Sequence, residues 1–421
     1  MNNLILKAKG LWSNFITLFR EKNWQGVFQI VIFLFLTLSI FSTFSLAGRY
    51  GLNNINNLIY GVLLLIVLFY IFIYGRIVFD QFFVLISILN LIFILSSIIN
   101  WKFNSQNVTI LLLSITAFIL YQYLIADNGN IKQFELAFLL GGIGFLFYYF
   151  FVYAKPLLTL DFSKRLGNYF GNENGVAFHI SFVTIFFIYL AVFNKKKVCY
   201  VPVFIGLWFV VTTGSISGIL LLLIILLFVI YLNIPKDKKW VFFLSLVFLI
   251  IVAFLVLQIP SFIYYKRRIY GIINTFLGIE TGSIDGSSSE RAELSKQAFL
   301  MFLRRPLFGF GPSQIREYTS AGMYAHNNFA ELLGDYGLFG LLFFELLLFV
   351  PAIKIRKQGA EDRFLVFLVL IFVILSQLFL HPYTSKITYF IIAFAFASVF
   401  EPNKKHICLE LRFKLTFPKR P

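Results

Sequence analysis

The sequence predicts an all-α polytopic membrane protein with about 12 transmembrane helices. Hydrophobic residues make up 59% of the 421 residues and charged residues only 13%, which is far from the composition of a soluble domain. Apolar runs of about 20 residues, enough to cross a bilayer as a helix, recur along the chain between short polar breaks. The Lys and Arg residues fall in those breaks, so the formal net charge of +17 indicates membrane orientation and not nucleic-acid binding.

We predict one integral membrane domain over residues 1–421. The expected spans are 27–47, 58–74, 82–99, 107–125, 134–153, 176–193, 198–213, 215–232, 240–258, 337–353, 364–380 and 386–400. Two connections exceed a simple turn, at residues 154–175 and 260–336. The second is predicted to fold against the membrane face, with a short surface helix over residues 290–303.

The basic residues also predict the orientation. With the N-terminus inside, most of the Lys and Arg residues lie on the cytoplasmic side, and the short clusters Lys195–Lys197 and Lys236–Lys239 favour this arrangement most strongly. Both termini are then cytoplasmic, and the 260–336 loop lies on the external, periplasmic side. The two cysteines, Cys199 and Cys408, are both assigned to the inner side, which argues against a disulfide framework.

One long polar segment, Ser289 to Gly340, interrupts the apolar runs. It contains His326 and Asn327, in a polar run that starts at Tyr324. Histidine has an unperturbed pKa of about 6.5, so it is suited to taking a proton from a sugar hydroxyl. The alternative is an interfacial histidine that caps a helix. We expect a helix to begin near Asn328, which places His326 close to a helix N-terminus.

Arginines are the candidates for binding an anion in this loop. Residues 261–335 hold eight basic and seven acidic side chains, so selected arginines and not a diffuse basic surface must bind any phosphate. Arg291, beside a turn-like segment, is the first candidate. The turn at residues 305–311, with one proline and two glycines, either brings backbone N–H groups to a ligand or only returns the chain to the membrane.

A second polar group of residues lies in the 154–175 connection. Arg165 is followed by Asn172, Glu173 and Asn174 at the start of an apolar span. Polar groups at membrane depth are costly unless they line a cavity, so these side chains are candidate substrate contacts. The alternative is a loop that caps a helix. No Asp-x-Asp pair, HExxH motif or close Cys/His cluster is found, which predicts chemistry without a metal or cofactor.

Taken in chain order, the group that starts at Arg165 and the group that contains His326 resemble the O-antigen ligase and O-antigen polymerase superfamily of bacterial polysaccharide assembly. The resemblance covers roughly residues 160–345. Its later motif is similar to Arg291, Pro306 to Gly311, His326-Asn327, Glu331 and Gly337 to Gly340. Its earlier motif is similar to Arg165 through Ala177, with Glu173 where many relatives have proline. One departure is the segment Thr213 to Gly218, which lacks an arginine that relatives often carry.

The resemblance implies a GT-C-like, inverting and metal-independent glycosyltransferase in the bacterial inner membrane. Its substrates would be undecaprenyl-pyrophosphate-linked oligosaccharides at the external face. It implies that His326 is the catalytic base and that Arg291 and Arg165 bind the pyrophosphate. The implied sugar contacts are Asn327, Asn174, Asn172, Glu173 and Tyr324.

Three functions fit these residues. A polymerase for O-antigen or capsule joins repeat units, and an O-antigen ligase transfers the glycan to lipid A-core. A lipid-linked oligosaccharide flippase is the alternative of another class, although its functional charges should lie near the bilayer midplane. Expected partners are the bilayer, the lipid-linked donor and acceptor, and a chain-length regulator and flippase of the same pathway, with no nucleic acid.

Overall fold

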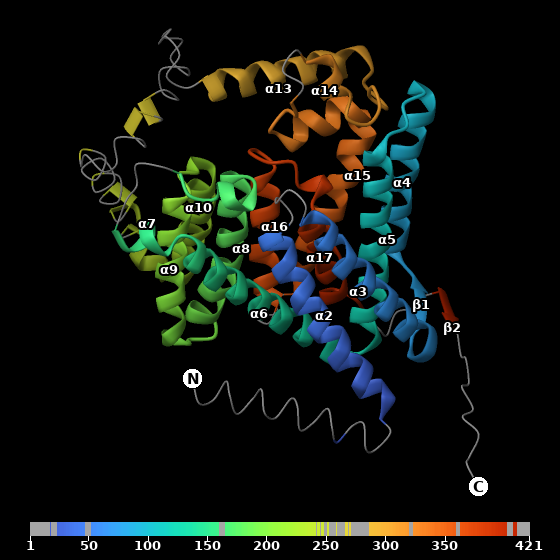
Figure 1. Ribbon diagram of the computed structural model, residues 1–421, viewed down its shortest axis with the longest axis horizontal. Coiled ribbons are helices and arrows are strands. Elements are labelled where there is room, and N and C mark those ends of the chain that lie inside the picture. Colours follow the sequence, from blue (N-terminus) through green and yellow to red (C-terminus); the bar gives the residue numbers. More distant parts are fainter. Residues whose placement is uncertain are drawn as a thin grey trace.

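The computed structural model describes residues 23–46, 52–159, 165–240, 286–319, 323–358, 363–401 and 407–410, with Thr17 and scattered positions between 242 and 270. Within these residues the protein is a bundle of helices around one extended hydrophobic core (Figure 1). The predicted all-α membrane class is confirmed. The predicted span 240–258 lies largely outside the described residues.

The helices follow the predicted spans closely. The first five are α2 (Trp24–Leu46), α3 (Asn53–Tyr74), α4 (Gln81–Asn100), α5 (Ser105–Ala126) and α6 (Asn128–Val152). The next are α7 (Ala154–Thr159), η1 (Asn168–Phe170), α8 (Glu173–Val192), η2 (Lys197–Cys199), α9 (Tyr200–Thr212), α10 (Ile216–Asn233) and η3 (Lys236–Lys238). The last are α13 (Gly286–Arg304), α14 (Gln314–Tyr318), α15 (Asn328–Gln358), α16 (Phe364–Ser376), η6 (Pro382–Thr384) and α17 (Lys386–Ser398).

Not every helix is long enough to cross a bilayer alone. By length and composition, 8 helices in the described part of the chain could do so, and the apolar helices Lys197–Thr212, Phe364–Ser376 and Lys386–Ser398 are shorter. At about 1.5 Å per residue, a helix such as α17 is too short for a hydrocarbon core of about 30 Å. The short α17 lies inside the bundle, where other helices surround it and every residue from Ile387 to Ser398 is buried. The protein is therefore a multi-pass membrane protein, with some segments enclosed by others.

A kink divides α15, which begins at Asn328, ahead of the predicted span 337–353. Gly337 has a φ of 69°, and a Cβ atom on it would lie 2.5 Å from the Leu307 carbonyl group. Gly309 is its counterpart, because its φ is +64° and a Cβ there would lie 2.5 Å from the Asp335 carbonyl group. Only glycine fits such a crossing of two backbones.

The 305–311 turn directs its backbone N–H groups at α15. The N–H of Phe310 donates to the Gly334 carbonyl at 3.0 Å, and that of Gly311 donates to the Asp335 carbonyl at 2.8 Å. Of the two interpretations of this turn, the structural one is supported. Its glycines join the loop to α15, and these N–H groups have partners within the chain.

Aromatic contacts establish which helix ends lie together. Phe193 follows α8 and contacts Phe364 at the start of α16, with 4.2 Å between ring centroids. Phe178, near the start of α8, contacts Phe372 within α16 at 4.9 Å. The two helices are therefore antiparallel. The connection that precedes α8 lies at the same end of the bundle as the connection that follows α16, and η2 lies at the other end.

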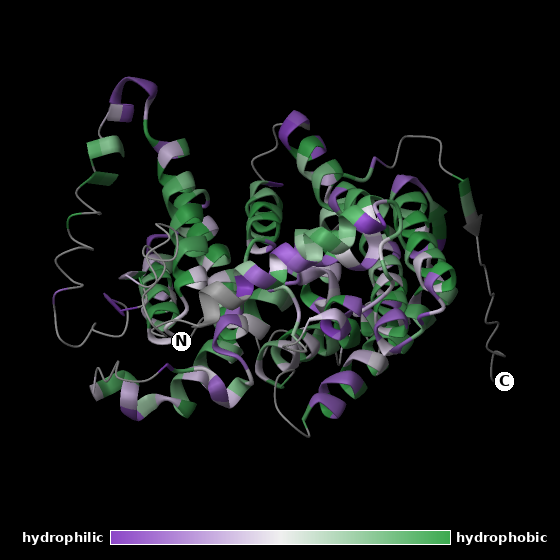
Figure 2. Ribbon diagram, turned by 90° about the horizontal axis from the view of Figure 1, so that it is seen from above, coloured by the Kyte–Doolittle hydropathy of each residue, from purple (hydrophilic) through white to green (hydrophobic). Residues whose placement is uncertain are grey.

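The connection that precedes α15 lies at that first end too. The N–H of Asn328 donates to the Gln377 carbonyl, just after α16, at 2.8 Å. We therefore call this end, which carries the Arg165 loop and the His326 segment, the His326 end, and the opposite end the Lys196 end. In Figure 1, α13 lies across the His326 end. Figure 2, viewed from that side, shows hydrophobic residues over most of the helices.

A small sheet adds two strands to the helices. The strands β1 (Arg76–Phe79) and β2 (Ile407–Glu410) pair antiparallel, with Val78 opposite Cys408. Gln122 of α5 holds β1 in place, because its side chain accepts from the Val78 N–H at 2.9 Å and donates to the Val78 carbonyl at 2.8 Å. Such short strands far apart in sequence have no period that a sequence analysis would detect.

Candidate functional site

An amphipathic helix forms one wall of the His326 end. Leu294, Ala298 and Met301 lie on one face of α13 and are buried. They pack with Ile315 of α14 and Ala325, directly before His326, in a cluster of their own. The predicted helix at residues 290–303 is thus present, and its apolar face packs against the protein. This packing holds Arg291, on the first turns of α13, at the same end as His326.

Asp335 fixes the position of α14. Its side chain is fully buried and accepts from the N–H of Ser313 at 2.9 Å and from that of Ile315 at 3.0 Å. Ser313 has a φ of 58°, which turns the chain into the short helix. A carboxyl group that accepts from such backbone donors caps the start of this short helix. Arg316, on this helix, is thereby held over the ring of Tyr324, with its guanidinium carbon 5.4 Å from the centroid.

His326 lies two residues before the start of α15, close to a helix N-terminus as the sequence predicts. The side-chain oxygen of Asn327 accepts from the Ala330 N–H at 3.1 Å and so caps the helix. His326 itself has a φ of 53°, an uncommon backbone conformation for a residue other than glycine. The turn directs the chain from the buried Ala325 into the helix. Asn327, predicted to contact a sugar, therefore uses its side-chain oxygen to hold His326 in position.

Two histidines lie against one tyrosine ring. The ring of Tyr324 is 4.0 Å from that of His326 and 4.1 Å from that of His381, measured between centroids. His381 comes from the connection between α16 and η6, far along the chain. Asn328 joins the two segments, because its amide donates to the Gln377 side chain at 2.6 Å and its oxygen accepts from the Tyr383 N–H at 3.3 Å.

A buried carboxyl group, that of Glu331, lies near Tyr324. Glu331 is 2% exposed and accepts a hydrogen bond from the Tyr383 hydroxyl at 3.3 Å. Tyr383 is fully buried, and Gln106 of α5 donates to its hydroxyl oxygen. Three stretches of chain far apart in the sequence thus share one hydrogen-bonded network. Such a network rigidifies the residues it connects.

Burial and neighbouring charge keep both histidines neutral near pH 7. Burial, followed by the positive charge of Arg291, lowers the pKa of His326 from 6.5 to about 4. Burial, followed by Arg316 and then His326, lowers the pKa of His381 from 6.5 to about 4. Burial raises the pKa of Tyr324, and the nearby Glu331 adds to this rise. Each imidazole therefore has a nitrogen that can accept a proton.

The Arg165 loop is held by its own polar side chains. Arg165 donates to the Thr213 carbonyl at 3.2 Å and to the Asn174 side chain at 3.0 Å, and its guanidinium lies 3.8 Å from the Glu173 carboxylate. The Asn172 side chain accepts from the Asn174 N–H at 2.8 Å and caps α8. These contacts match the helix-capping interpretation. About a quarter of the Arg165 side chain, 24%, remains exposed.

Residues 201–344 match the family model described as O-antigen ligase. This segment of the chain is similar to the O-antigen ligase family. The match supports the predicted O-antigen ligase and polymerase superfamily. No curated protein matches the chain.

The matched segment runs from α9 into α15 and so contains Arg291, Tyr324, His326 and Asn327. Arg165, Asn172, Glu173 and Asn174 precede it, at the same end of the bundle. Their contacts described above stay within the loop and with Thr213. The structure therefore brings His326 into contact with Tyr324, whereas the earlier motif forms a loop of its own at the same end of the bundle.

Sequence reasoning did not assign roles to Arg316, His381 and Tyr383. The signal for His381 was the polar stretch from His381 to Lys386 between two apolar spans. Arg316 was one of eight basic residues in the loop, with nothing to separate it from the others. Within the described residues, no three His, Cys, Asp or Glu side chains gather to form a metal site. Metal-independent chemistry stays a prediction.

Proposed function

We propose that the protein is a polysaccharide polymerase for O-antigen or capsule. It would be an inverting, metal-independent glycosyltransferase that joins undecaprenyl-pyrophosphate-linked repeat units. The observation that supports this most is the contact of two neutral histidines with the ring of Tyr324, with Arg291 and Arg316 near enough to influence the pKa of Tyr324. A proton acceptor beside cationic side chains is the combination that transfer from a pyrophosphate donor requires.

In this reaction His326 takes the proton. The acceptor hydroxyl oxygen attacks the anomeric carbon from the face opposite the pyrophosphate and forms the new glycosidic bond. The bond between that carbon and the pyrophosphate oxygen breaks, and its electron pair leaves with the pyrophosphate. The hydroxyl proton moves to the neutral imidazole of His326. Inversion of configuration follows from this single displacement.

Arg291 binds the departing pyrophosphate in this proposal. Its positive charge is one cause of the low pKa of His326. A bound pyrophosphate would offset that charge and raise the pKa of His326, so the base would become stronger when the donor is in place. Arg165 provides a second cation at the same end of the bundle, with part of its side chain exposed.

The sugar contacts remain proposals. Tyr324 is half-buried and would contact a sugar with the part of its side chain that remains exposed. The side-chain oxygens of Asn172 and Asn327 accept hydrogen bonds as helix caps. Their amide nitrogens are therefore the atoms that would contact a sugar, by donating to its hydroxyl groups. Asn174 and Glu173 would act through Arg165, whose guanidinium they hold.

The proposal also sets the orientation. The Lys196 end, which carries the clusters at residues 195–197 and 236–239, would be cytoplasmic together with both termini. The His326 end would be periplasmic or external, where lipid-linked repeat units are polymerised. A GT-C-like arrangement is part of the same proposal. The chain-length regulator and flippase of the pathway would be partners.

An O-antigen ligase is the second candidate, because the matching family model carries that description. Purified protein in liposomes would receive lipid-linked repeat units alone, and the products would be resolved by size. Growth of long chains supports the polymerase. A strict requirement for added lipid A-core supports the ligase. If correctly inserted His326→Ala protein made full-length polymer, the proposed mechanism would be wrong.

A further inference from the structure

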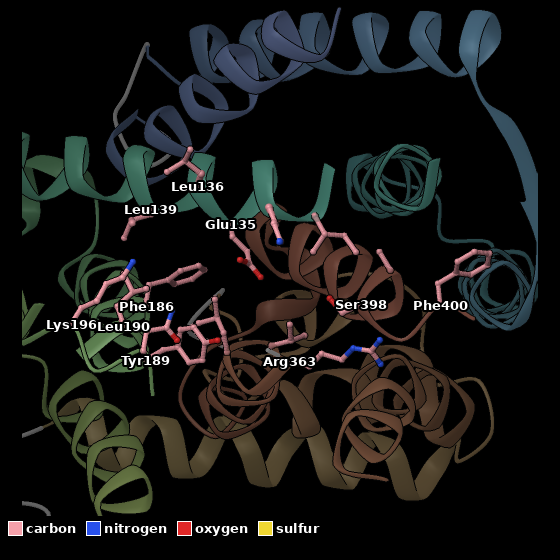
Figure 3. A pocket seen from close by; sticks show the side chains of 16 residues that line it. Glu135, Leu136, Leu139, Phe186, Tyr189, Leu190, Lys196, Arg363, Ser398 and Phe400 are labelled. Carbon is pink, nitrogen blue, oxygen red and sulfur yellow. The ribbon is translucent and has the colours of Figure 1, made fainter. Parts of the chain in front are cut away.

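A cavity of about 550 Å³ lies at the Lys196 end, at the opposite end of the bundle from His326. It is formed where α6, the connection after α8, α16 and the end of α17 meet (Figure 3). Arg363 directly precedes α16, and Ser398 is the last residue of α17. The cavity therefore sits where helices end, at the level expected for lipid headgroups. The proposed glycosyl transfer does not use it.

Cations from separate elements line this cavity. Lys132 comes from the start of α6, Lys196 from the connection after α8, and Arg363 from the residue before α16. Glu135 is the acidic residue among the lining side chains, which leaves two positive charges in excess. Figure 3 shows Glu135, Lys196 and Arg363 on different sides of the cavity. No single helix end accounts for this arrangement, because the start of α6 and two separate connections contribute.

Apart from Tyr189, Asn194 and Ser398, the remaining lining is apolar, and part of it reaches the outside of the bundle. Leu139, Phe186 and Leu190 line the cavity between α6 and α8. Leu136 also lines it and is 46% exposed on the surface of a membrane-spanning helix. A molecule in the cavity would therefore meet cations at the helix ends and hydrocarbon along the adjoining helix surface. A free inorganic ion would use only the first of these features.

We propose that this cavity binds an anionic phospholipid. The lipid phosphate lies among Lys132, Lys196 and Arg363, and an acyl chain runs along Leu136 and Leu139. Basic pockets between transmembrane helices recognise acidic headgroups in this way, and each Lys or Arg near the surface adds to the attraction. The shared chemistry is a phosphate group, and the membrane is its source because of the apolar wall.

Binding to the purified full-length protein in detergent would be measured by native mass spectrometry and by fluorescence titration. The probes are phosphatidylglycerol, phosphatidylcholine and inorganic phosphate. We expect phosphatidylglycerol to bind, and the Lys196→Gln/Arg363→Gln double variant to bind it about 10- to 30-fold more weakly. The matched control is Lys195→Gln/Lys197→Gln, which removes two charges from the same connection but none from the cavity lining. The control should stay within about twofold of the wild type.

A second variant tests the cavity without changing any charge. Leu139→Trp places a large side chain in the cavity and should abolish phosphatidylglycerol binding. If the double variant fails to fold, Leu139→Trp still tests whether phosphatidylglycerol binds in the cavity. Equal losses in the Lys195/Lys197 control would overturn the proposal in favour of diffuse surface attraction. Equal binding of phosphatidylcholine, or full competition by inorganic phosphate, would overturn the assignment to an anionic lipid.

Discussion

Two polar regions lie at the same end of this bundle, and they use their polar side chains differently. In the His326 region, the ring of Tyr324 contacts both His326 and His381, with the Arg316 guanidinium nearby. In the Arg165 loop, the guanidinium donates to Thr213 and Asn174, so it mainly holds its own loop. Both regions look equally polar in the sequence. The structure separates a group arranged around a shared ring from a loop that maintains its own shape.

This difference indicates which substitutions should reduce the rate of glycosyl transfer most. In the proposed reaction His326 is the side chain that takes the proton, so no other group performs that step. Arg165 is a second cation, so Arg291 can compensate in part for its loss. Loss of the Arg165 side chain should therefore weaken binding more than it slows the chemical step. Loss of His326 should act on the chemical step itself.

The largest effect is expected for His326→Ala. Removal of a positioned proton acceptor should reduce glycosyl transfer by about 10²- to 10⁴-fold. His381→Ala should cost about tenfold or less, because His381 contacts Tyr324 but takes no proton in the proposed reaction. Transfer would be measured with purified lipid-linked repeat units, on variants of wild-type thermal stability. A larger loss for His381→Ala would reverse the assignment of the base.

The next effect separates the two arginines. Arg291→Gln should lower kcat by about 10²-fold, because the charge that develops on the leaving pyrophosphate loses a partner. Arg165→Gln should instead raise KM, by about tenfold, with a smaller change in kcat. Initial rates at several donor concentrations measure both. If Arg165→Gln produced the larger fall in kcat, the Arg165 loop would be the centre of the site.

A third effect concerns pH. The neutral form of His326 is the active one and its pKa is about 4, so activity in the absence of other titrations should fall as the pH drops towards 4. In Arg291→Gln the lost positive charge raises the pKa of His326, so the acid limb should move to higher pH. Because the unfolded chain protonates His326 first, folding stability should also decline as the pH falls from 6.5 to about 4. Rate profiles and thermal unfolding curves recorded at the same pH values separate the loss of activity from the loss of folding stability. An acid limb unmoved in Arg291→Gln would contradict this coupling.

The smallest effect concerns the helix cap in the Arg165 loop. Asn172→Ala removes the acceptor for the Asn174 N–H and should destabilise the protein by about 1 kcal/mol. Asn172→Asp keeps an acceptor and is the matched control, with stability near that of the wild type. Unfolding in detergent, followed by circular dichroism, measures both. Equal stability of Asn172→Ala and wild type would mean that this loop is not maintained by its cap.

Several local features were predictable from the sequence. The helix near residues 290–303 follows from its apolar spacing, and the helix start at Asn328 follows from the polar run before it. The 305–311 turn was recognised as a turn, but its contact with the kink at Gly337 was not. At that contact two backbones cross so closely that a Cβ atom on Gly337 would lie 2.5 Å from the Leu307 carbonyl group, and no local pattern encodes such a crossing.

The sequence by itself determined the membrane class, most of the helix positions and the candidate residues of the later motif. It could do so because hydropathy, charge placement and helix signals are properties of neighbouring residues. Three features became visible only in the folded bundle: His381 contacts Tyr324, Arg165 holds its own loop, and the start of α6 and two connections contribute cations to a cavity at the Lys196 end. These features depend on contacts between segments far apart in the chain, and packing of the whole bundle determines such contacts.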